Sequence, residues 1–283
     1  MKKRCSGQLL TLPMGLWSIC FVGVSLLYII GLSFMQGDGQ MGVTGEFTLD
    51  NYTSMLKPAY GKVLLSSLEL AAQTTLLTML IGYPFGYLMA GTGPRMRTVL
   101  MLLVIVPFWT NALIRLYGWK ILLNASGPIN DTLKAIGIID KPLKLLNTEG
   151  SVLLGMVYAM LPFMILPSYT AVEKMDWSVV EAARDLGAGR FRAFVTTTLP
   201  LTLSGVMAGC VLPFIPSIGL FFISDLLGGA KTPLVGNLIN DAYKKSRDLP
   251  FAAALSVVFL AVTGLIIAVY RRFGGKSSDL GLF

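Results

Sequence analysis

Long apolar stretches, each bounded by residues that break helices, constrain this chain more than any other feature. A helix needs about 20 predominantly apolar residues to cross a bilayer. Six stretches reach this length, at about 11–34, 64–90, 97–122, 151–172, 201–226 and 250–271. Gly, Pro, Asn and charged residues fill the segments between them. The pattern predicts an all-α membrane protein with six transmembrane helices, in which residues 1–283 form a single transmembrane domain.

The composition narrows the chemistry that such a chain can perform. Only 13% of its residues are charged and its mean hydropathy is +0.69, whereas a soluble domain carries about 25% charged residues. There is no His, which removes the usual catalytic base and the commonest metal ligand. The three Cys residues show no metal-ligand spacing, and the net charge of +8 is modest. We therefore expect no catalytic residue, no bound metal and no binding of nucleic acid.

Basic residues predict the side of the membrane on which the termini lie, because Lys and Arg concentrate in short cytoplasmic loops. An even number of spans places both termini on one side. Compact basic clusters fall on that side, at 2–4, 95–97, 174–192 and 271–276. The first apolar run is too long for the core of a signal peptide, so we interpret it as an uncleaved span. The prediction is a multi-pass protein of the inner (plasma) membrane with cytoplasmic N- and C-termini.

The loop between the fourth and fifth spans, residues 173–200, is the most informative segment. Ser178 and Glu181 have the S-x-x-E spacing of a capping box, which predicts a helix beginning at about Val179. Gly187 is suited to end this helix, because glycine enters the left-handed conformation without a steric penalty. A second short helix is expected at 190–198, before the fifth span.

The first of these helices has the character of a docking surface. Ala182 and Ala183 leave room for a partner to approach closely. Glu181, Arg184 and Asp185 place polar anchors beside them. The alternative is an ordinary capped connector, since capping boxes are common in proteins of every kind.

This loop resembles the EAA loop of permease subunits in type I ABC importers. The matching residues are Glu181, Ala182, Ala183, Gly187, Leu199 and Pro200, while Thr197 stands where the family usually has an aliphatic residue. The resemblance implies a type I ABC importer permease fold with a cytoplasmic EAA coupling helix between spans four and five. It implies that this helix sits in a groove of a separate ATPase subunit. The implied coupling residues are Glu181, Ala182, Ala183, Arg184, Asp185, Gly187, Leu199 and Pro200.

A narrower resemblance, to the B-type permeases of spermidine/putrescine importers, covers most of the chain. It rests on the segments VPFWTN (106–111), IRLYG (114–118), LPFM (161–164), AARDLGA (182–188), SDLLGGAK (224–231) and RDLPF (247–251). It implies import of polyamines by alternating access. The implied partners are a C-type permease subunit in a heterodimer, an ATPase dimer that binds ATP and Mg, and an extracytoplasmic polyamine-binding protein. Relatives for other solutes share this fold, so another small solute is the first alternative.

Two other functions were weighed against an importer subunit. A phosphate loop for ATP requires G-x-x-x-x-G-K-[ST]; Gly275, Lys276 and Ser277 match its end, but Tyr270 occupies the first glycine position. A secondary transporter usually shows inverted repeats and buried ion sites, and the sequence suggests neither. We therefore expect a transport subunit without enzymatic activity, driven by ATP hydrolysis on a partner chain.

A path for a polycation needs carboxylates, carbonyl groups and aromatic faces, which attract ammonium groups. In the third span Phe108 and Trp109 adjoin Pro107, where a helix kinks or breaks, and Asn111 and Tyr117 follow. These aromatic and amide side chains are candidate solute contacts. For Trp109 an anchor at the membrane interface is an equal alternative.

Two charged residues complete the candidate path. Asp225 ends the predicted fifth span, and a carboxylate within the membrane usually faces a cavity or a partner; solvation at the interface is the alternative. Arg115 would repel a cationic solute, so we expect it to pair with a carboxylate such as Glu69.

Overall fold

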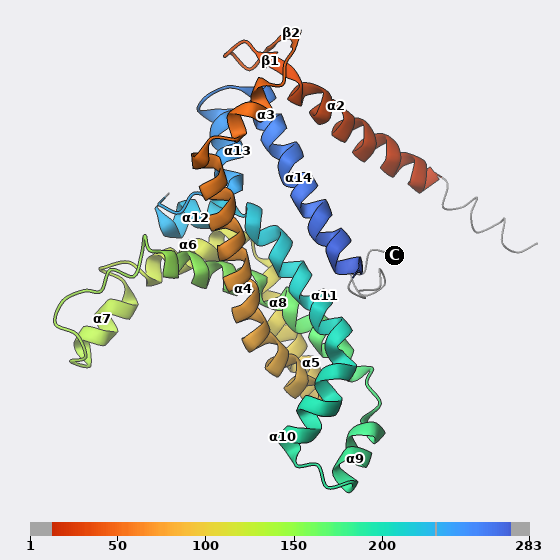
Figure 1. The fold of residues 1–283 in the computed structure, drawn as a ribbon. Coiled ribbons are helices and arrows are strands. Elements are labelled where there is room, and N and C mark those ends of the chain that lie inside the picture. Colours follow the sequence, from red (N-terminus) through yellow and green to blue (C-terminus); the bar gives the residue numbers. More distant parts are fainter. Residues whose placement is uncertain (1–12, 230, 273–283) are drawn as a thin grey trace, which may run out of the picture. The chain divides into compact units, whose positions relative to one another are not determined.

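The chain is almost entirely helical in the computed structural model, which describes residues 13–229 and 231–272 (Figure 1). Five helical runs of the described residues are long and apolar enough to cross a membrane: Pro13–Ser33, Pro58–Ala90, Glu149–Glu173, Arg190–Gly219 and Leu249–Arg272. A sixth span results if Pro94–Trp109 and Ala112–Leu122, which are bent by 95°, are taken together. The all-α fold predicted from the sequence is confirmed, and its third span is broken.

The long runs divide into the helices labelled in Figure 1. They are η1 (Ile19–Gly23) with α2 (Val24–Ser33), α4 (Pro58–Ala90), α5 (Pro94–Ile105) with η2 (Val106–Trp109), α6 (Ala112–Leu122), α8 (Glu149–Glu173), α11 (Leu199–Gly219) and α14 (Leu249–Arg272). The shorter elements are β1 (Met35–Gly37), β2 (Val43–Phe47), α3 (Asp50–Met55), α7 (Pro128–Ala135), α9 (Trp177–Asp185), α10 (Arg190–Ala193), η3 (Phe194–Thr198), α12 (Phe221–Gly228) and α13 (Val235–Lys244).

The third span breaks where the sequence predicted a kink. Pro107 lacks a backbone N–H and lies in the 3₁₀ turn η2, after which Thr110 is extended, with ψ 149°. The side chain of Asn111 then accepts a hydrogen bond of 2.8 Å from the Leu113 amide and begins α6. Asn is among the preferred N-cap residues, so the new helix starts with one of its free amides satisfied.

The fifth span is shorter at its carboxyl end than the sequence predicted. We expected one helix over 201–226, but α11 ends at Gly219 and Leu220 leaves the helical region, with φ −74° and ψ 62°. Two prolines, Pro213 and Pro216, lie in the preceding turns and cannot donate to the helical ladder. Asp225 therefore belongs to the separate helix α12 rather than to the end of the span.

The chain forms two compact units, of which Met1–Lys62 with Asn237–Gly264 is one. Its antiparallel hairpin pairs Met35 of β1 with Phe47 of β2. Asn51 of α3 ties the end of the first span in place, because its side-chain amide donates to the carbonyl oxygens of Ser33 and Met35 at 3.0 and 2.9 Å. Ala242, Ala252 and Leu255 of this unit share a buried cluster.

The second unit, Val63–Gly236 with Leu265–Phe283, contains most of the packed helices. Tyr83 and Met89 of α4, Met164 and Tyr169 of α8, and Val206 of α11 share one buried cluster. A second cluster joins Leu116 of α6, Val152 and Met156 of α8, and Ile223 and Leu227 of α12.

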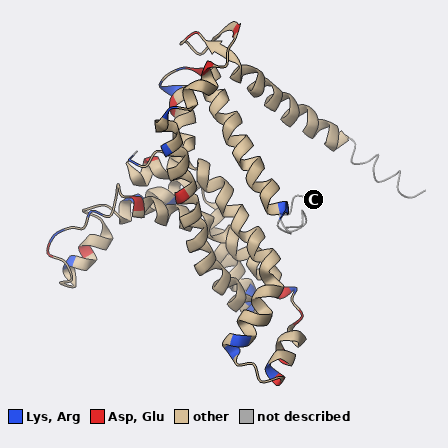
Figure 2. Cartoon of the chain, in the orientation of Figure 1, with Lys and Arg blue, Asp and Glu red and all other residues tan. Residues whose placement is uncertain are grey.

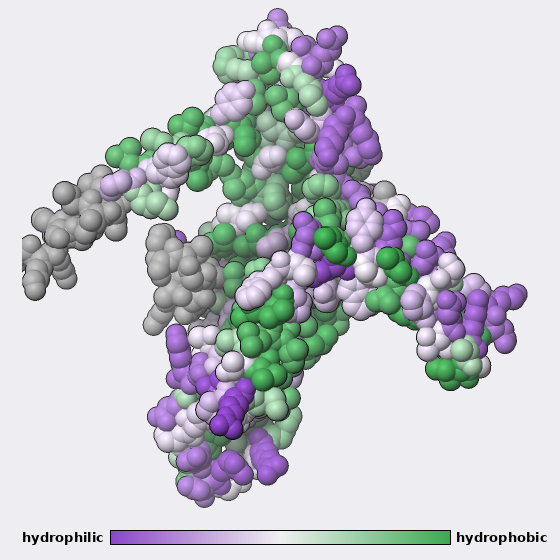
Figure 3. Space-filling model, turned by 180° about the vertical axis from the view of Figure 1, so that it is seen from behind, coloured by the Kyte–Doolittle hydropathy of each residue, from purple (hydrophilic) through white to green (hydrophobic). Residues whose placement is uncertain are grey.

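The surface of the helices is the surface expected in lipid. In Figure 2 the long helices are mostly without charged residues, and Lys, Arg, Asp and Glu gather near their ends and in the connecting segments. On the face shown in Figure 3 the hydrophobic residues lie along the helices and the hydrophilic ones at the connecting segments. Side chains such as Ile19 and Leu27 are 74% and 69% exposed within this chain, so lipid or another subunit must cover them.

Close packing of α4 on α8 depends on Gly86. A Cβ atom at this position would lie 2.9 Å from the backbone nitrogen of Tyr169 and 3.1 Å from the carbonyl oxygen of Ile165. Backbone atoms cannot rotate aside as a side chain does. At Gly82, one turn earlier, the nearest obstacle is the flexible side chain of Met164, at 2.9 Å.

We expect Gly86→Ala to destabilise the protein by about 1–3 kcal/mol, the usual cost of overpacking. Gly61→Ala in the same helix is the matched control and should cost less, because an added Cβ atom there would meet no heavy atom within 4 Å. The measurement is the midpoint of thermal unfolding of each purified variant in detergent. Equal midpoints for the two variants would contradict the close backbone contact.

Candidate functional site

The helix α9 begins two residues before the position predicted from the sequence. Asp176 is its N-cap, and a carboxylate oxygen of Asp176 accepts a 3.0 Å hydrogen bond from the Ser178 amide. Ser178 therefore lies inside the first turn, and the predicted capping box between Ser178 and Glu181 is wrong. Asp caps a helix as well as Ser does, so the helix starts at Asp176, two residues before Ser178.

The end of α9 is as predicted from Gly187. This residue has φ +90°, and its amide donates to the Arg184 carbonyl at 2.9 Å. The Ala188 amide donates to the Ala183 carbonyl at 3.1 Å. This pair of hydrogen bonds is a Schellman motif, which satisfies the last carbonyl groups of a helix and turns the chain sharply.

The helical run that follows the turn does not stop before the membrane span. α10 begins at Arg190 and continues through the π turn η3 into α11. In that turn the Leu199 amide donates to the Phe194 carbonyl, and Pro200 has no amide to donate. A π turn accommodates the missing donor, so α10 and the fifth span are one helical run, Arg190–Gly219. A displacement of the turn would therefore be transmitted along this span.

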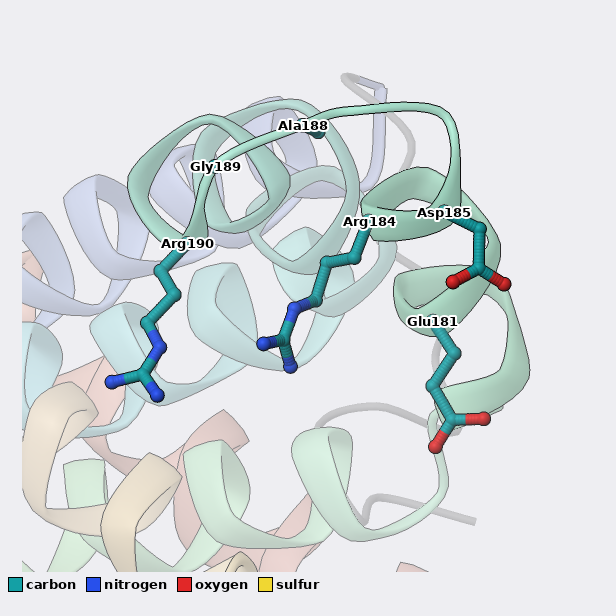
Figure 4. A pocket seen from close by; sticks show the side chains of 6 residues that line it. All are labelled: Glu181, Arg184, Asp185, Ala188, Gly189 and Arg190. Carbon is teal, nitrogen blue, oxygen red and sulfur yellow. The ribbon is translucent and has the colours of Figure 1, made fainter.

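The two short helices enclose a hollow of about 470 Å³. It is lined by Glu181, Arg184, Asp185, Ala188, Gly189 and Arg190 (Figure 4). Figure 4 shows the side chains of Arg184 and Arg190 extending to the same side of the turn, with Glu181 and Asp185 beside them on α9. The hollow thus presents both signs of charge to a binding partner.

Two apolar side chains project beside this charged hollow. Leu186 is 89% exposed and Phe191 is 80% exposed. Ala182 is exposed as well, and Ala183 is half-buried. Large exposed apolar side chains next to charged ones are typical of a protein–protein contact.

Contacts at the base of the turn join it to the membrane helices. Arg97, near the start of α5, donates from Nη1 to Oε1 of Glu173 at 2.6 Å. The Tyr87 ring of α4 packs against the rings of Trp177 and Phe194, with centroid separations of 6.0 and 5.7 Å. The start of α9 and the start of the fifth span are therefore held by the same residue of α4.

The predicted solute contacts of the third span lie around its break, and they differ in their surroundings. Trp109 is 78% exposed, and Asn111 is the N-cap of α6. Tyr117 is half-exposed, with Nζ of Lys120 5.8 Å from its ring centroid. Phe108 lines a cavity between α6 and α8.

Asp225 lies apart from that cavity. It is an exposed residue of α12, whereas Phe222 of the same helix is one of the residues that line the cavity. The structure therefore does not bring Asp225 and Phe108 to one site within this chain.

The predicted ion pair between Arg115 and Glu69 is wrong. The guanidinium carbon of Arg115 lies 4.2 Å from the ring centroid of Phe108, and Glu69 accepts a 3.3 Å hydrogen bond from the side chain of Gln73. Arg115 also faces Tyr158, at 5.7 Å. Tyr158, Phe163 and Phe222 were not among the predicted site residues, because aromatic residues in apolar helices give no sign in the sequence of which cavity they line.

Comparison with known proteins identifies the family. Residues 82–275 match the family described as "Binding-protein-dependent transport system inner membrane component". The chain belongs to this family. Among its relatives, the spermidine/putrescine transport system permease protein PotB of Escherichia coli (strain K12) is 46% identical over 256 residues, which cover 90% of this chain and 93% of that protein. The PotB protein of Haemophilus influenzae is 44% identical, with 90% of each chain covered.

Solved structures of ABC importers show the same permease fold. A bacterial alginate ABC transporter, in complex with an alginate pentasaccharide-bound periplasmic protein, matches with a TM-score of 0.76 at 15% sequence identity. The match covers 96% of this permease and 94% of that chain. The MetNI methionine ABC transporter in an inward-facing conformation matches with a TM-score of 0.59 at 15% identity, covering 77% of this chain and 97% of the other. The permease therefore has the type I ABC importer fold predicted from its sequence.

The N-cap of α9 carries a testable pH dependence. The side chain and the backbone amide of Ser178 donate to Asp176 and hold the pKa of its carboxyl group below the ordinary value. A lowered folded-state pKa stabilises the helix above the unfolded pKa of about 3.9, and this stabilisation is lost as the pH falls through the folded pKa. The stability of the first turn of α9 should therefore not change between about pH 5 and pH 8.

We expect Asp176→Ala to speed amide hydrogen exchange at the start of α9 by about 2- to 30-fold, from the usual effect of a lost N-cap. Asp176→Asn is the matched control, because Asn also caps helices but does not titrate in this range. The measurement is hydrogen–deuterium exchange of the peptide that contains residues 177–180, at pH 7. Unchanged exchange in Asp176→Ala would contradict the assigned cap.

Proposed function

We propose that this permease is the B-type membrane subunit of an ATP-driven importer that moves polyamines, spermidine or putrescine, into the cytoplasm. The observation that carries the proposal is the α9–α10 turn, an exposed charged and apolar surface continuous with the fifth span. The polyamine assignment is supported by the 46% identity to a spermidine/putrescine permease over nine-tenths of the chain. Import of another small solute by the same kind of complex is the alternative, and a secondary transporter would make no use of the turn.

The partners follow from the same reasoning. A C-type permease subunit pairs with this chain as a heterodimer, an ATPase dimer with ATP and Mg binds beneath the α9–α10 turn, and an extracytoplasmic polyamine-binding protein delivers the solute. Under this proposal both termini are cytoplasmic, and no part of this chain hydrolyses ATP or binds a cofactor.

The mechanism couples closure of the ATPase to the fifth span. The residues in contact with the ATPase are Glu181, Ala182, Ala183, Arg184, Asp185 and Gly187, while Leu199 and Pro200 lie in the run that transmits the movement. When ATP closes the ATPase dimer, the turn shifts and α10 carries the shift into α11 without a loop between them. Pro213 and Pro216, in the last turns of α11, provide a weakened point at which the span can bend.

The solute path runs past the break of the third span. Phe108, Trp109 and Tyr117 provide aromatic faces, each of which attracts an ammonium group by about 0.5–2 kcal/mol. Asn111 offers an amide, and Asp225 is a carboxylate on α12 that draws the cation toward the same half of the permease. Hydrolysis of ATP then resets the complex to face the cytoplasm.

The first test is ATPase activity of the whole complex. This chain is co-expressed with its genomic neighbours and reconstituted in lipid, and ATP hydrolysis is measured with and without spermidine-loaded binding protein. We expect clear stimulation by the loaded protein and none by the unloaded protein. A rate of ATP hydrolysis that neither spermidine nor putrescine changes would refute the polyamine assignment. The assignment of the chain to an ATP-driven importer would still stand.

The coupling role predicts a specific variant. We expect Ala182→Trp to lower stimulated ATPase activity and uptake by about tenfold or more, because a bulky side chain on the exposed face removes more than about 1.4 kcal/mol of binding to the ATPase. Leu203→Trp, on the exposed surface of the fifth span, is the matched control and should retain both activities. Full uptake by Ala182→Trp would mean that α9 is only a connector.

A further inference from the structure

A cavity of about 170 Å³ lies between α6, α8 and the segment around the start of α12. Four aromatic rings line it, those of Phe108, Tyr158, Phe163 and Phe222. Arg115 is the one charged residue among those that line it, and the others are small or aliphatic apart from the rings. A cation beside four aromatic rings and no carboxylate needs a physical explanation, because burying even part of a charge without an opposite charge is costly.

The rings themselves hold the guanidinium group. Its central carbon lies 4.2 Å from the ring centroid of Phe108 and 5.7 Å from that of Tyr158. Phe163 meets Phe108 edge-on, with centroids 6.0 Å apart and planes at 80°. A cation within about 6 Å of a ring face is attracted by the negative charge of that face, so Arg115 occupies a cation site made of aromatic side chains.

Two of the three nitrogen atoms of the guanidinium group make no hydrogen bond within the described residues. Nε and Nη1 of Arg115 are buried, and no residue in the described part of the chain supplies an acceptor to either atom. An acceptor from another subunit would have to displace side chains of this chain to reach them, since these already cover both atoms. Buried donors without acceptors carry a free-energy penalty, so the side chain is held less firmly than a paired arginine.

We propose that Phe108, Tyr158, Phe163 and Phe222 form a cation-binding cage whose resident cation is the side chain of Arg115, and that an alkylammonium group of the solute takes its place during transport. The cavity of about 170 Å³ beside the guanidinium has room for an ammonium group with a short methylene chain, since a single water needs only about 10–15 Å³ of such volume. While Arg115 is in place, its charge keeps other cations out of the cage.

The identity of the solute rests on the proposed function, but the cage does not. The probe is therefore methylguanidinium, the smallest mimic of the end of Arg115. Its inhibition of ATPase activity stimulated by the binding protein is measured on the complete complex in lipid, with whichever solute stimulates the wild type. We compare Arg115→Met, which removes the resident cation, with Arg115→Lys, which keeps one. The variant Phe108→Leu is made both alone and together with Arg115→Met.

In the wild type and in Arg115→Lys the cage is filled, so inhibition should need a high concentration of the probe. In Arg115→Met the empty cage should bind it, and the inhibitory concentration should fall by about 3- to 30-fold, the range for a cation–π contact. Adding Phe108→Leu should restore the wild-type value. Lys134→Met, which removes a cation of α7 that does not line the cavity, is the matched control and should behave as the wild type.

Three results would overturn the proposal. Equal inhibition of the wild type and Arg115→Met would show that the rings bind no free cation. Loss of assembly in Arg115→Met but not in Phe108→Leu would show that a partner subunit supplies an acceptor to Arg115. Loss of assembly in both variants would show that Arg115 and Phe108 are needed for packing of the subunit and not for binding a cation.

The polyamine assignment is tested separately in the same assay. If another solute, but no polyamine, stimulates the ATPase activity of the wild type, that assignment alone is refuted.

Discussion

The structure depends on the rule that backbone groups in a bilayer must find hydrogen bonds within the protein. A continuous helix satisfies the rule, so a break needs its own partners. At the break of the third span, Asn111 supplies one by accepting from the Leu113 amide. Phe108 lies in η2 before the break and Arg115 in α6 after it. The ring and the guanidinium meet across the break, with the ring centroid 4.2 Å from the guanidinium carbon.

The α9–α10 turn also satisfies its backbone groups within the protein. Asp176 caps the start of α9, and the Schellman hydrogen bonds at Gly187 cap its end. A short helix with both ends satisfied keeps its shape when a partner presses on it. The π turn at Phe194–Thr198 then accommodates Pro200 without ending the helix. Under the proposed function, a rigid α9–α10 turn joined to a continuous span would transmit a displacement by the ATPase into a movement of α11.

The sequence predicted the features that arise from local chemistry. Span positions follow from apolar length, the end of α9 from Gly187, and the break of the third span from Pro107. The sequence did not predict features for which two residues compete for one structural role, or features that depend on tertiary contacts. Asp176 starts α9 before Ser178 can, and the end of α11 at Gly219 leaves Asp225 on another helix. Arg115 was assigned to a carboxylate because charge pairing is the usual solution, and a sequence cannot show that Phe108 lies over its guanidinium.

The use of rings rather than carboxylates at the cage has a physical reason. A solute moves through a membrane protein only if each site binds it well enough to admit it and weakly enough to release it. A polycation beside several buried carboxylates would be held by charge interactions that are strong at low dielectric. An aromatic face offers only about 0.5–2 kcal/mol, and the resident Arg115 opposes even that. Exchange of one cation for another then changes the net charge of the cage little, so the solute is bound there weakly enough to be released.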